Sequence, residues 1–175
     1  MEKLKNEDLE RKSLAEFKDA KKMPLIVVLD NVRSALNVGS VFRTSDAFMV
    51  RKIYLCGITA KPPSKEIRKT ALGADESVEW EYVEDANNLV SGLKGSGNRV
   101  IAVEQVKGAR SLADLEVFKD QTIVFVFGHE VNGVSQEIVD LADECVEIPQ
   151  YGTKHSLNVS VSVGVVLWEA VRKMV

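Results

Sequence analysis

The sequence predicts an α/β domain built on a mainly parallel sheet. Short runs rich in β-branched residues alternate along the chain with amphipathic stretches, which is typical of repeated strand-helix units. These runs are continuously apolar, as expected for strands that are buried on both faces. A chain of 175 residues has the usual size of one domain. We therefore expect one compact unit with ligands bound where the strands end.

The elements follow in order along the chain. Residues 1–22 carry leucines and Phe17 at helical spacing among many charges, which predicts an N-terminal surface helix that Pro24 ends. Residues 23–175 then form the main domain. Strands are predicted at 25–29, 52–56, 100–103, 122–127 and 145–148, and helices near 38–48, 64–72, 85–93 and 135–141.

The last segment, 156–173, alternates at first like a strand. It is too long for an ordinary strand, and its cationic end suits the carboxyl end of a helix dipole. We predict a helix that Ser156 or Asn158 caps. The small residues Ser160 and Gly164 lie four positions apart, so we expect another backbone to approach this helix closely.

Composition excludes several classes of protein. No apolar run approaches the roughly 20 residues that span a bilayer, and the charged first residues do not resemble a signal peptide. We expect a cytoplasmic protein with no membrane contact. The two cysteines, Cys56 and Cys145, lie far apart in apolar runs and lack metal-ligand spacing. Neither a disulfide nor a bound metal is expected.

The charge is unevenly distributed. The formal net charge is −3, which argues against a protein that coats polyanions nonspecifically. Residues 43–69 nevertheless hold seven basic and two acidic side chains, whereas residues 70–175 hold eight basic and seventeen acidic ones. A local basic surface is what selective phosphate binding requires. Scattered solvated lysines would give the same count, so charge alone leaves both interpretations open.

Three segments place small or polar residues where a predicted strand gives way to a loop or helix. In the first, residues 31–46, a polar loop leads into a helix that turns Val38, Val41, Phe42 and Phe48 toward the core. Asn37 lies near the predicted N-cap, and Arg43 lies on the flank of the helix. Taken alone, this segment indicates a capping asparagine and an exposed arginine.

The second segment, residues 127–134, follows an apolar strand. Gly128 permits a close approach at the strand end, and Gly133 permits the turn before Ser135 caps the next helix. The segment is neither a dinucleotide-binding glycine motif nor a phosphate-binding P-loop. Nucleotide binding and an ordinary glycine turn remain equally good interpretations.

The third segment, residues 148–160, leads from a strand through a loop into the last helix. His155 offers a base, although a single histidine in a polar loop is usually a surface residue. Lys154 and His155 offer contacts to phosphate.

Together, the three segments resemble the ordered motifs of the SpoU (TrmH-like) branch of the SPOUT RNA methyltransferases. Leu36, His129 and Gln150 stand where that family commonly has histidine, asparagine or glutamine, and methionine. The similarity runs from about residue 25 to the C-terminus and includes residues 69–74. The motifs are Asn37-x-Gly39-x-x-x-Arg43-Thr44, Phe127-Gly128-x-Glu130-x-x-Gly133 and Ile148-Pro149-x(6)-Ser156-Leu157-Asn158-Val159-Ser160.

The resemblance implies a SPOUT-type fold whose C-terminal part forms a deep trefoil knot, an exception to the rule against knots. It also implies a homodimer in which the first motif of one subunit lies near the cofactor of the other. The cofactor is S-adenosylmethionine, and the positions that would hold it are Glu104, Phe127, Gly128, Ile148 and Leu157.

The activity implied by the resemblance is methyl transfer to a ribose 2′-hydroxyl of a structured RNA, tRNA before rRNA, with no role for DNA. Arg43 occupies the catalytic position of the family. Because arginine stays protonated, we expect Arg43 to grip a phosphate and stabilise alkoxide charge rather than act as a base. Asn37 would orient it, and Glu130, Ser156 and Asn158 would complete the site. The expected RNA contacts are Arg33, Lys61, Lys65, Arg68, Lys69 and Lys154.

Three alternatives remain open. A methyltransferase of the same fold could act on a base nitrogen, although the first motif with Arg43 argues against it. A catalytically silent module could bind S-adenosylmethionine as a dimer, although the retained polar motif residues argue against that. A nicotinamide dehydrogenase is more distant, because the glycine motif of such enzymes is missing.

Overall fold

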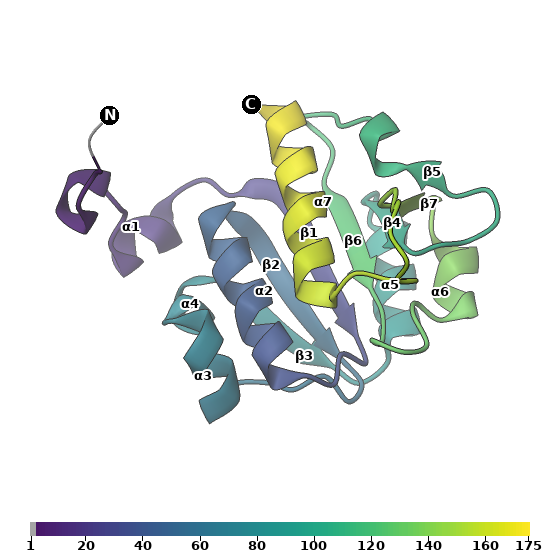
Figure 1. Cartoon of the computed structure of the whole chain (residues 1–175), viewed down its shortest axis with the longest axis horizontal. Coiled ribbons are helices and arrows are strands. Elements are labelled where there is room, and N and C mark those ends of the chain that lie inside the picture. Colours follow the sequence, from purple (N-terminus) through teal and green to yellow (C-terminus); the bar gives the residue numbers. More distant parts are fainter. Residues whose placement is uncertain (1–2) are drawn as a thin grey trace.

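Seven strands form one parallel sheet, in the order β3-β2-β1-β6-β4-β7-β5 (Figure 1). The structure is a computed structural model that describes residues 3–175, except for the side chains of residues 6 and 7. The strands are β1 (Met23–Asp30), β2 (Val50–Cys56), β3 (Trp80–Val83), β4 (Arg99–Val103), β5 (Arg110–Ser111), β6 (Ile123–Phe127) and β7 (Glu144–Glu147).

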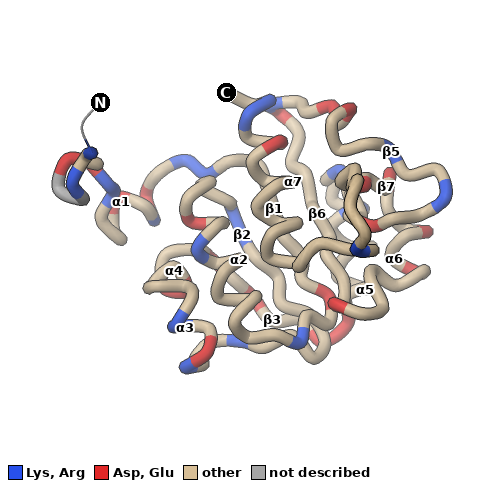
Figure 2. The backbone as a smooth tube through the Cα atoms, viewed as in Figure 1, with Lys and Arg blue, Asp and Glu red and all other residues tan. Residues whose placement is uncertain are grey.

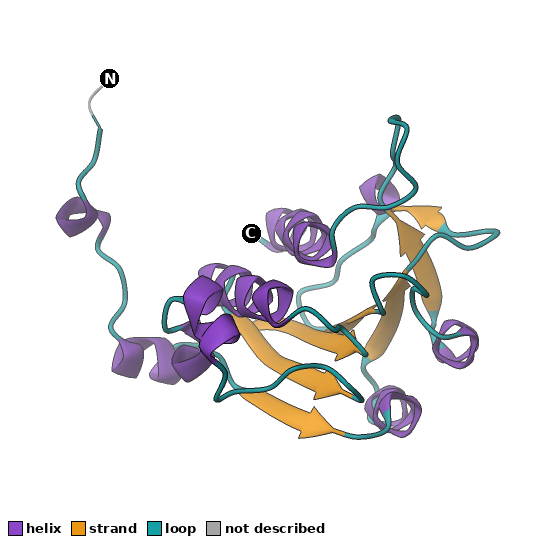
Figure 3. Cartoon of the chain, turned by 60° about the horizontal axis from the view of Figure 1, so that its bottom comes forward, coloured by secondary structure: helices purple, strands orange, loops and turns teal. Residues whose placement is uncertain are grey.

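Helices cover both faces of the sheet. Figure 3 shows α2, α3 and α7 over one face and α5 and α6 over the other. The α-helices are α1 (Leu14–Asp19), α2 (Ala35–Ala47), α3 (Lys65–Ala71), α4 (Ala74–Ser77), α5 (Ala86–Gly95), α6 (Gln136–Leu141) and α7 (Val159–Met174). Two 3-10 turns, η1 (Asn6–Leu9) and η2 (Leu112–Asp114), complete the described elements.

The two central strands explain why the predicted runs were continuously apolar. Successive side chains of β1 and β6 point to opposite faces, and helices cover both of them. Val27 and Phe125 belong to the cluster under α2 and α7, whereas Val28 and Val126 belong to the cluster under α5 and α6. Burial of this apolar surface is the main favourable contribution to folding.

Strand β7 lies between β4 and β5, although it comes after both in the chain. Val103 at the end of β4 and Arg110 at the start of β5 both pair with Val146 of β7. The connection 104–109 therefore crosses the line of β7 near its carboxyl end. The predicted α/β class with a parallel sheet is confirmed, and the trefoil knot stays a prediction.

The N-terminal segment differs from the predicted single helix over 1–22. Within the described residues it consists of η1 and α1, and it extends away from the sheet (Figure 3). Glu10 interrupts the helix with a left-handed φ of 42°, and Ser13 caps a new one. Pro24 lies inside β1 rather than at the end of a helix. Among the described side chains of this segment only Phe17 is in the core, so little packing energy favours a continuous helix.

Most of the other predicted elements are confirmed. All five predicted strands and the four middle helices are present, and α7 begins after Asn158, whose Oδ1 accepts a hydrogen bond from the Ser160 amide at 2.9 Å. Gly164 meets the side chain of Thr44 on α2, so the expected close neighbour of α7 is a helix of the same chain. The prediction for Asn37 as N-cap was wrong. Ser34 caps α2, and its Oγ accepts a hydrogen bond from the Asn37 amide.

Cys56 and Cys145 are both free thiols. The side chains that the structure describes, those of residues 3–5 and 8–175, contain no group of acidic, histidine and cysteine residues arranged to hold a metal ion. Among the helices of those residues, none has the length and apolar character needed to cross a membrane.

Candidate active site

A cleft opens where β4, β6 and β7 end. Its enclosed volume is about 100 Å³, and about 560 Å³ when the space open to solvent at the mouth is included. The five residues predicted to hold the cofactor, Glu104, Phe127, Gly128, Ile148 and Leu157, all line it. Ser156 lines it too. The walls therefore combine apolar side chains from the strand ends with polar groups from the loops.

The floor of the cleft depends on two glycines. A Cβ on Gly128 would come within 2.2 Å of the Gly133 carbonyl group, so only a glycine lets the two backbone segments cross here. Gly133 has a φ of +68°, and a Cβ there would collide with the Glu104 carboxylate. That carboxylate accepts a hydrogen bond from the Val134 amide at 2.8 Å. The end of β4 is thereby joined to the turn after β6.

The loop 148–158 forms the outer wall of the cleft. Gln105, which follows β4, donates a hydrogen bond from Nε2 to the His155 carbonyl oxygen at 3.0 Å. Residues 151–158 are otherwise exposed, and Leu157 reaches the cleft from this loop. The Gln105 side chain thus helps to hold an exposed loop over the cleft.

A chain of hydrogen bonds joins the three sequence motifs. The Glu130 carboxylate accepts from the backbone amides of Arg33 and Ser34, both at 3.0 Å. It also accepts from Asn37 Nδ2 at 3.5 Å. Asn37 Oδ1 then accepts from Asn158 Nδ2 at 3.1 Å. These hydrogen bonds therefore join the segments that follow β1 and β6 to the start of α7. The three segments are those that carry the sequence motifs.

The direction of these bonds follows from Glu130. An ionised carboxylate only accepts hydrogen bonds, so Asn37 must turn its NH₂ group toward it and its oxygen toward Asn158. Asn158 then donates its own NH₂ group and keeps its oxygen for Ser160. Burial alone would raise the pKa of Glu130, but the amides of Ser34 and Arg33 and the Asn37 side chain outweigh it and lower the pKa. Glu130 is therefore an ionised anchor and a weak base.

Arg43 lies apart from the cleft. It is exposed on α2 and borders a second hollow, formed with residues of the N-terminal segment that include Arg11, Ser13 and Phe17. Among the described residues Arg43 has no ion pair. Within one chain, then, the structure brings together Asn37, Glu130 and Asn158, with Ser156 on the cleft wall, and leaves Arg43 outside.

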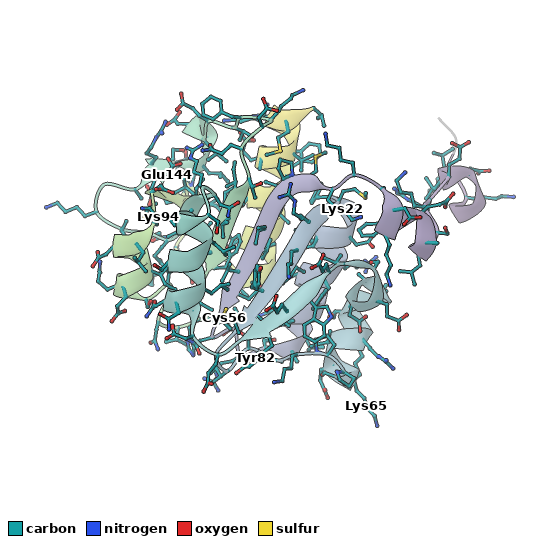
Figure 4. The ribbon with its side chains drawn as sticks, turned by 180° about the vertical axis from the view of Figure 1, so that it is seen from behind. Lys22, Cys56, Lys65, Tyr82, Lys94 and Glu144 are labelled. Atoms are coloured by element: carbon teal, nitrogen blue, oxygen red, sulfur yellow. The ribbon has the colours of Figure 1, made fainter. Side chains whose placement is uncertain are left out.

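The expected RNA-contacting cations are all exposed. Lys65, Arg68 and Lys69 project from α3, the blue-marked helix at the lower left of Figure 2, and Lys65 points away from the sheet in Figure 4. Lys61 lies over the Tyr82 ring, 3.7 Å from its centre. Arg33 and Lys154 lie on two other loops. Within the described part of the chain, none of the six forms an ion pair, so each charge is free for phosphate.

Sequence reasoning missed three residues that shape the site. Gln105 holds the outer loop, Ser34 caps α2, and Thr70 donates a hydrogen bond to the Leu36 carbonyl at 2.8 Å. Thr70 lies against Gly39, where a Cβ would come within 2.1 Å of its Oγ1. The position of Gln105 directly after a strand was an available signal. The Gly39–Thr70 contact joins two helices and has no local signature.

The cleft suits S-adenosylmethionine. Its apolar strand ends and polar loop groups match a ligand that combines an adenosine with charged groups. An α/β domain with this cleft has the architecture of the SPOUT class of RNA methyltransferases. The chain belongs to the SpoU rRNA Methylase family, whose model matches residues 24–168.

Two known proteins that are similar to this chain carry the name of a tRNA 2′-O-methyltransferase. A protein from Aquifex aeolicus named tRNA (guanosine(18)-2′-O)-methyltransferase is 34% identical over 93% of this chain and 75% of its own length. A protein of the same name from Escherichia coli is 31% identical over 88% of this chain and 66% of its own length.

Two solved structures support the same grouping. A tRNA-modifying enzyme from A. aeolicus, described as TrmH/SpoU, superimposes with a TM-score of 0.81 at 32% identity, covering 91% of this chain and 80% of its own. An rRNA methyltransferase from Sinorhizobium meliloti with bound S-adenosylmethionine has a TM-score of 0.81 at 27% identity, covering 91% of this chain and 60% of its own. Family and fold therefore agree.

Proposed function

We propose that this protein transfers a methyl group from S-adenosylmethionine to a ribose 2′-hydroxyl of tRNA. The observation that carries the proposal is the hydrogen-bonded chain Glu130–Asn37–Asn158 beside the cleft. It fixes a polar surface next to a pocket suited to the methyl donor. The tRNA 2′-O-methyltransferases similar to this chain support the substrate, and the RNA would be met in the cytoplasm.

The protein contributes to the reaction mainly by aligning the ribose oxygen with the methyl group and its sulfur. S-adenosylmethionine supplies an electrophilic methyl group on its sulfonium sulfur. The residues that would hold S-adenosylmethionine in the cleft are Glu104, Gly128, Ile148 and Leu157. Asn37 and Asn158 would orient the ribose, because holding reactants in line replaces a bimolecular encounter with a near-unimolecular step.

As the methyl group passes from sulfur to the ribose oxygen, the hydroxyl proton passes to solvent water, and the charge that develops on the oxygen needs a separate group. Arg43 stays protonated, so its role is to bind the neighbouring phosphate and stabilise negative charge as it develops on the oxygen. Glu130 is engaged in three hydrogen bonds and has a lowered pKa, so it holds the first motif in place rather than taking the proton.

A homodimer would bring Arg43 to a cleft. We infer the dimer from the exposed side of α7, where Val161, Val165 and Trp168 are 51%, 39% and 57% exposed. Leu36 on α2 and Leu157 before α7 are also exposed. Figure 1 shows α2 and α7 side by side, so these apolar side chains are contributed by neighbouring elements. An apolar surface of this kind marks an interaction site.

The test is nucleoside mass spectrometry after incubation of the pure protein with methyl-labelled S-adenosylmethionine. Unmodified tRNA and unmodified rRNA are supplied in separate reactions. Label in a 2′-O-methylated nucleoside from tRNA supports the proposal, and label only in rRNA reassigns the substrate. Label in a methylated base, or none despite measured cofactor binding, overturns the reaction and leaves the base methyltransferase or the silent module.

A further inference from the structure

The turn between β6 and α6 is organised around one imidazole. His129 Nδ1 accepts hydrogen bonds from the backbone amides of Val131 and Asn132, at 3.0 and 3.2 Å. The backbones of His129 and Gly133 also exchange two hydrogen bonds, at 3.1 and 2.8 Å, which close the turn. The side chain of Val131 at the tip is 80% exposed, so the turn has little apolar packing to stabilise it.

This turn carries two contacts on which the site depends. From it the Glu130 carboxylate reaches the amides of Arg33 and Ser34 in the first motif. From its other end the Val134 amide reaches the Glu104 carboxylate in the cleft. A change in the shape of the turn would therefore move an anchor of the polar chain and a wall of the cleft together.

We propose that His129 is a positioning residue whose unprotonated Nδ1 holds the turn 129–133 in the shape that presents Glu130 to the first motif. Accepting hydrogen bonds at Nδ1 requires that the ring proton be on Nε2. A second proton would occupy Nδ1 and turn the acceptor into a donor facing two amide donors. The turn would then lose both bonds. This inference rests on the proposed methyltransferase function only for its kinetic readout.

Several ionisable groups surround the imidazole. Burial raises the pKa of Asp30 at the end of β1; the Asn31 side chain lowers it, Asp85 before α5 raises it, and His129 has a smaller lowering effect. Burial and these two carboxylates raise the pKa of the Cys56 thiol to about 12, so the thiol stays neutral. Glu130 on the turn and Glu104 directly after β4 complete the set.

The experiment compares His129→Leu, which has no acceptor, with His129→Asn, which has an acceptor that does not titrate. An asparagine oxygen can accept from the amide two residues onward, as in an Asx turn, so it can replace the bond to Val131. His155→Asn is the matched control, because the chain has only two histidines. The readout is kcat/KM for methyl transfer to tRNA between about pH 5 and 8, the range in which imidazoles change charge.

We expect His129→Leu to lower kcat/KM at the alkaline end by roughly tenfold to thirtyfold, the scale of two lost hydrogen bonds. His129→Asn should stay within about threefold of the wild type, as one bond is retained, and should lack the fall in rate toward acid pH. The wild type and His155→Asn should both show that fall. A wild-type rate in His129→Leu, or an acid fall that persists in His129→Asn, would overturn the proposal.

A second measurement needs no substrate. In proton-nitrogen correlation spectra, the Val131 and Asn132 amide protons of the wild type should shift upfield as the pH falls and His129 is protonated. In His129→Leu they should lie upfield at every pH, and in His129→Asn the Val131 amide should keep its position. Amide shifts that ignore His129 would refute the positioning role even if methyl transfer is confirmed. Shifts that follow it, with no transfer to any RNA, would support the role while the proposed function fails.

Discussion

Asn158 donates a hydrogen bond from Nδ2 to Oδ1 of Asn37, a residue 121 positions earlier in the chain, at 3.1 Å. This contact joins the start of α7 to the first turn of α2. Because Asn37 also reaches Glu130, it couples the last motif of the chain to the other two.

Arg43→Ala should abolish methyl transfer and leave the affinity for S-adenosylmethionine unchanged. The physical reason is that Arg43 does not line the cleft of its own chain and that, at a partner's cleft, its proposed contact is the RNA phosphate and not the cofactor. Turnover assays combined with calorimetric titration of the cofactor measure both quantities. Arg43→Lys keeps the charge but not the bidentate geometry, so it should recover only part of the rate. Equal losses of turnover and cofactor affinity would contradict this role.

Glu130→Gln should destabilise the protein at neutral pH and much less in acid. A carboxylate with a lowered pKa stabilises the folded state above its unfolded pKa, and the contribution is lost as the pH falls through the lower folded value. The stability difference between wild type and variant should therefore be full at pH 7 and shrink below about pH 4.3. Urea unfolding at several pH values measures it. A difference that grows in acid would show that Glu130 is not ionised in its contacts.

Neutralising Lys61, Lys65, Arg68 and Lys69 should reduce the salt dependence of tRNA binding. Removing a cation that neutralises one phosphate lowers the slope of log affinity against log salt by roughly one. Filter binding over a salt series measures the slope. Lys69→Gln and Lys119→Gln form a matched pair, because both lysines are exposed but Lys119 lies on the loop that leads into the central strand β6 and not on α3. Equal slopes for these two variants would argue against an RNA surface on α3.

Gly128→Ala should lower the melting temperature strongly. Its Cβ would meet backbone atoms of Gly133 and Val134 at 2.2 to 2.3 Å, and backbone cannot rotate out of the way as a side chain can. Overpacking of this kind costs about 3 kcal/mol, or roughly 6 to 12 °C for a chain of this size. Gly92→Ala is the control, because nothing lies within 4 Å of its Cβ and alanine favours the interior of α5. Calorimetry should show a small rise for this control.

Val165→Glu should convert the proposed dimer into monomers. A charge in the centre of the exposed apolar side of α7 would have to be desolvated on association. Light scattering after size exclusion measures the mass. Phe118→Glu changes a comparably exposed apolar residue on the loop between η2 and β6, outside the apolar side of α7, and should leave the mass unchanged. A monomeric wild type would end the dimer proposal directly.

Strands and helices were predicted correctly from the sequence where their side chains are buried. The fully buried strands β1 and β6 were found because burial on both faces leaves a continuous apolar run. Strand β3 was missed because Glu81 and partly exposed neighbours interrupt its pattern, and β5 because it has two residues. The predicted helix over 1–22 was wrong because its periodicity came from leucines that stay largely exposed. Helix α4 has only four residues and no pattern of its own.

For the site, the motifs located the cleft residues but not their connections. The Asn37 side chain was expected at an N-cap, whereas the backbone geometry gives that task to Ser34 and frees Asn37 for Glu130 and Asn158. The separation of Arg43 from the cleft depends on how α2 lies across the sheet, which no local pattern encodes. Contacts between residues distant in sequence could therefore not be predicted from the sequence.

The order of strands has a consequence for synthesis of the protein on the ribosome. Strand β7 fills the gap between β4 and β5, so that gap stays open until residue 147 has emerged. Helix α7, which buries Val163, Val166 and Leu167 against the sheet, emerges later still. A nascent chain therefore presents unpaired strand edges and apolar surface until α7 has formed. During that time it is prone to aggregation and to binding by chaperones. Release of a shortened chain would leave neither a cleft nor a closed core, so a truncated product would be removed rather than act as a partial enzyme.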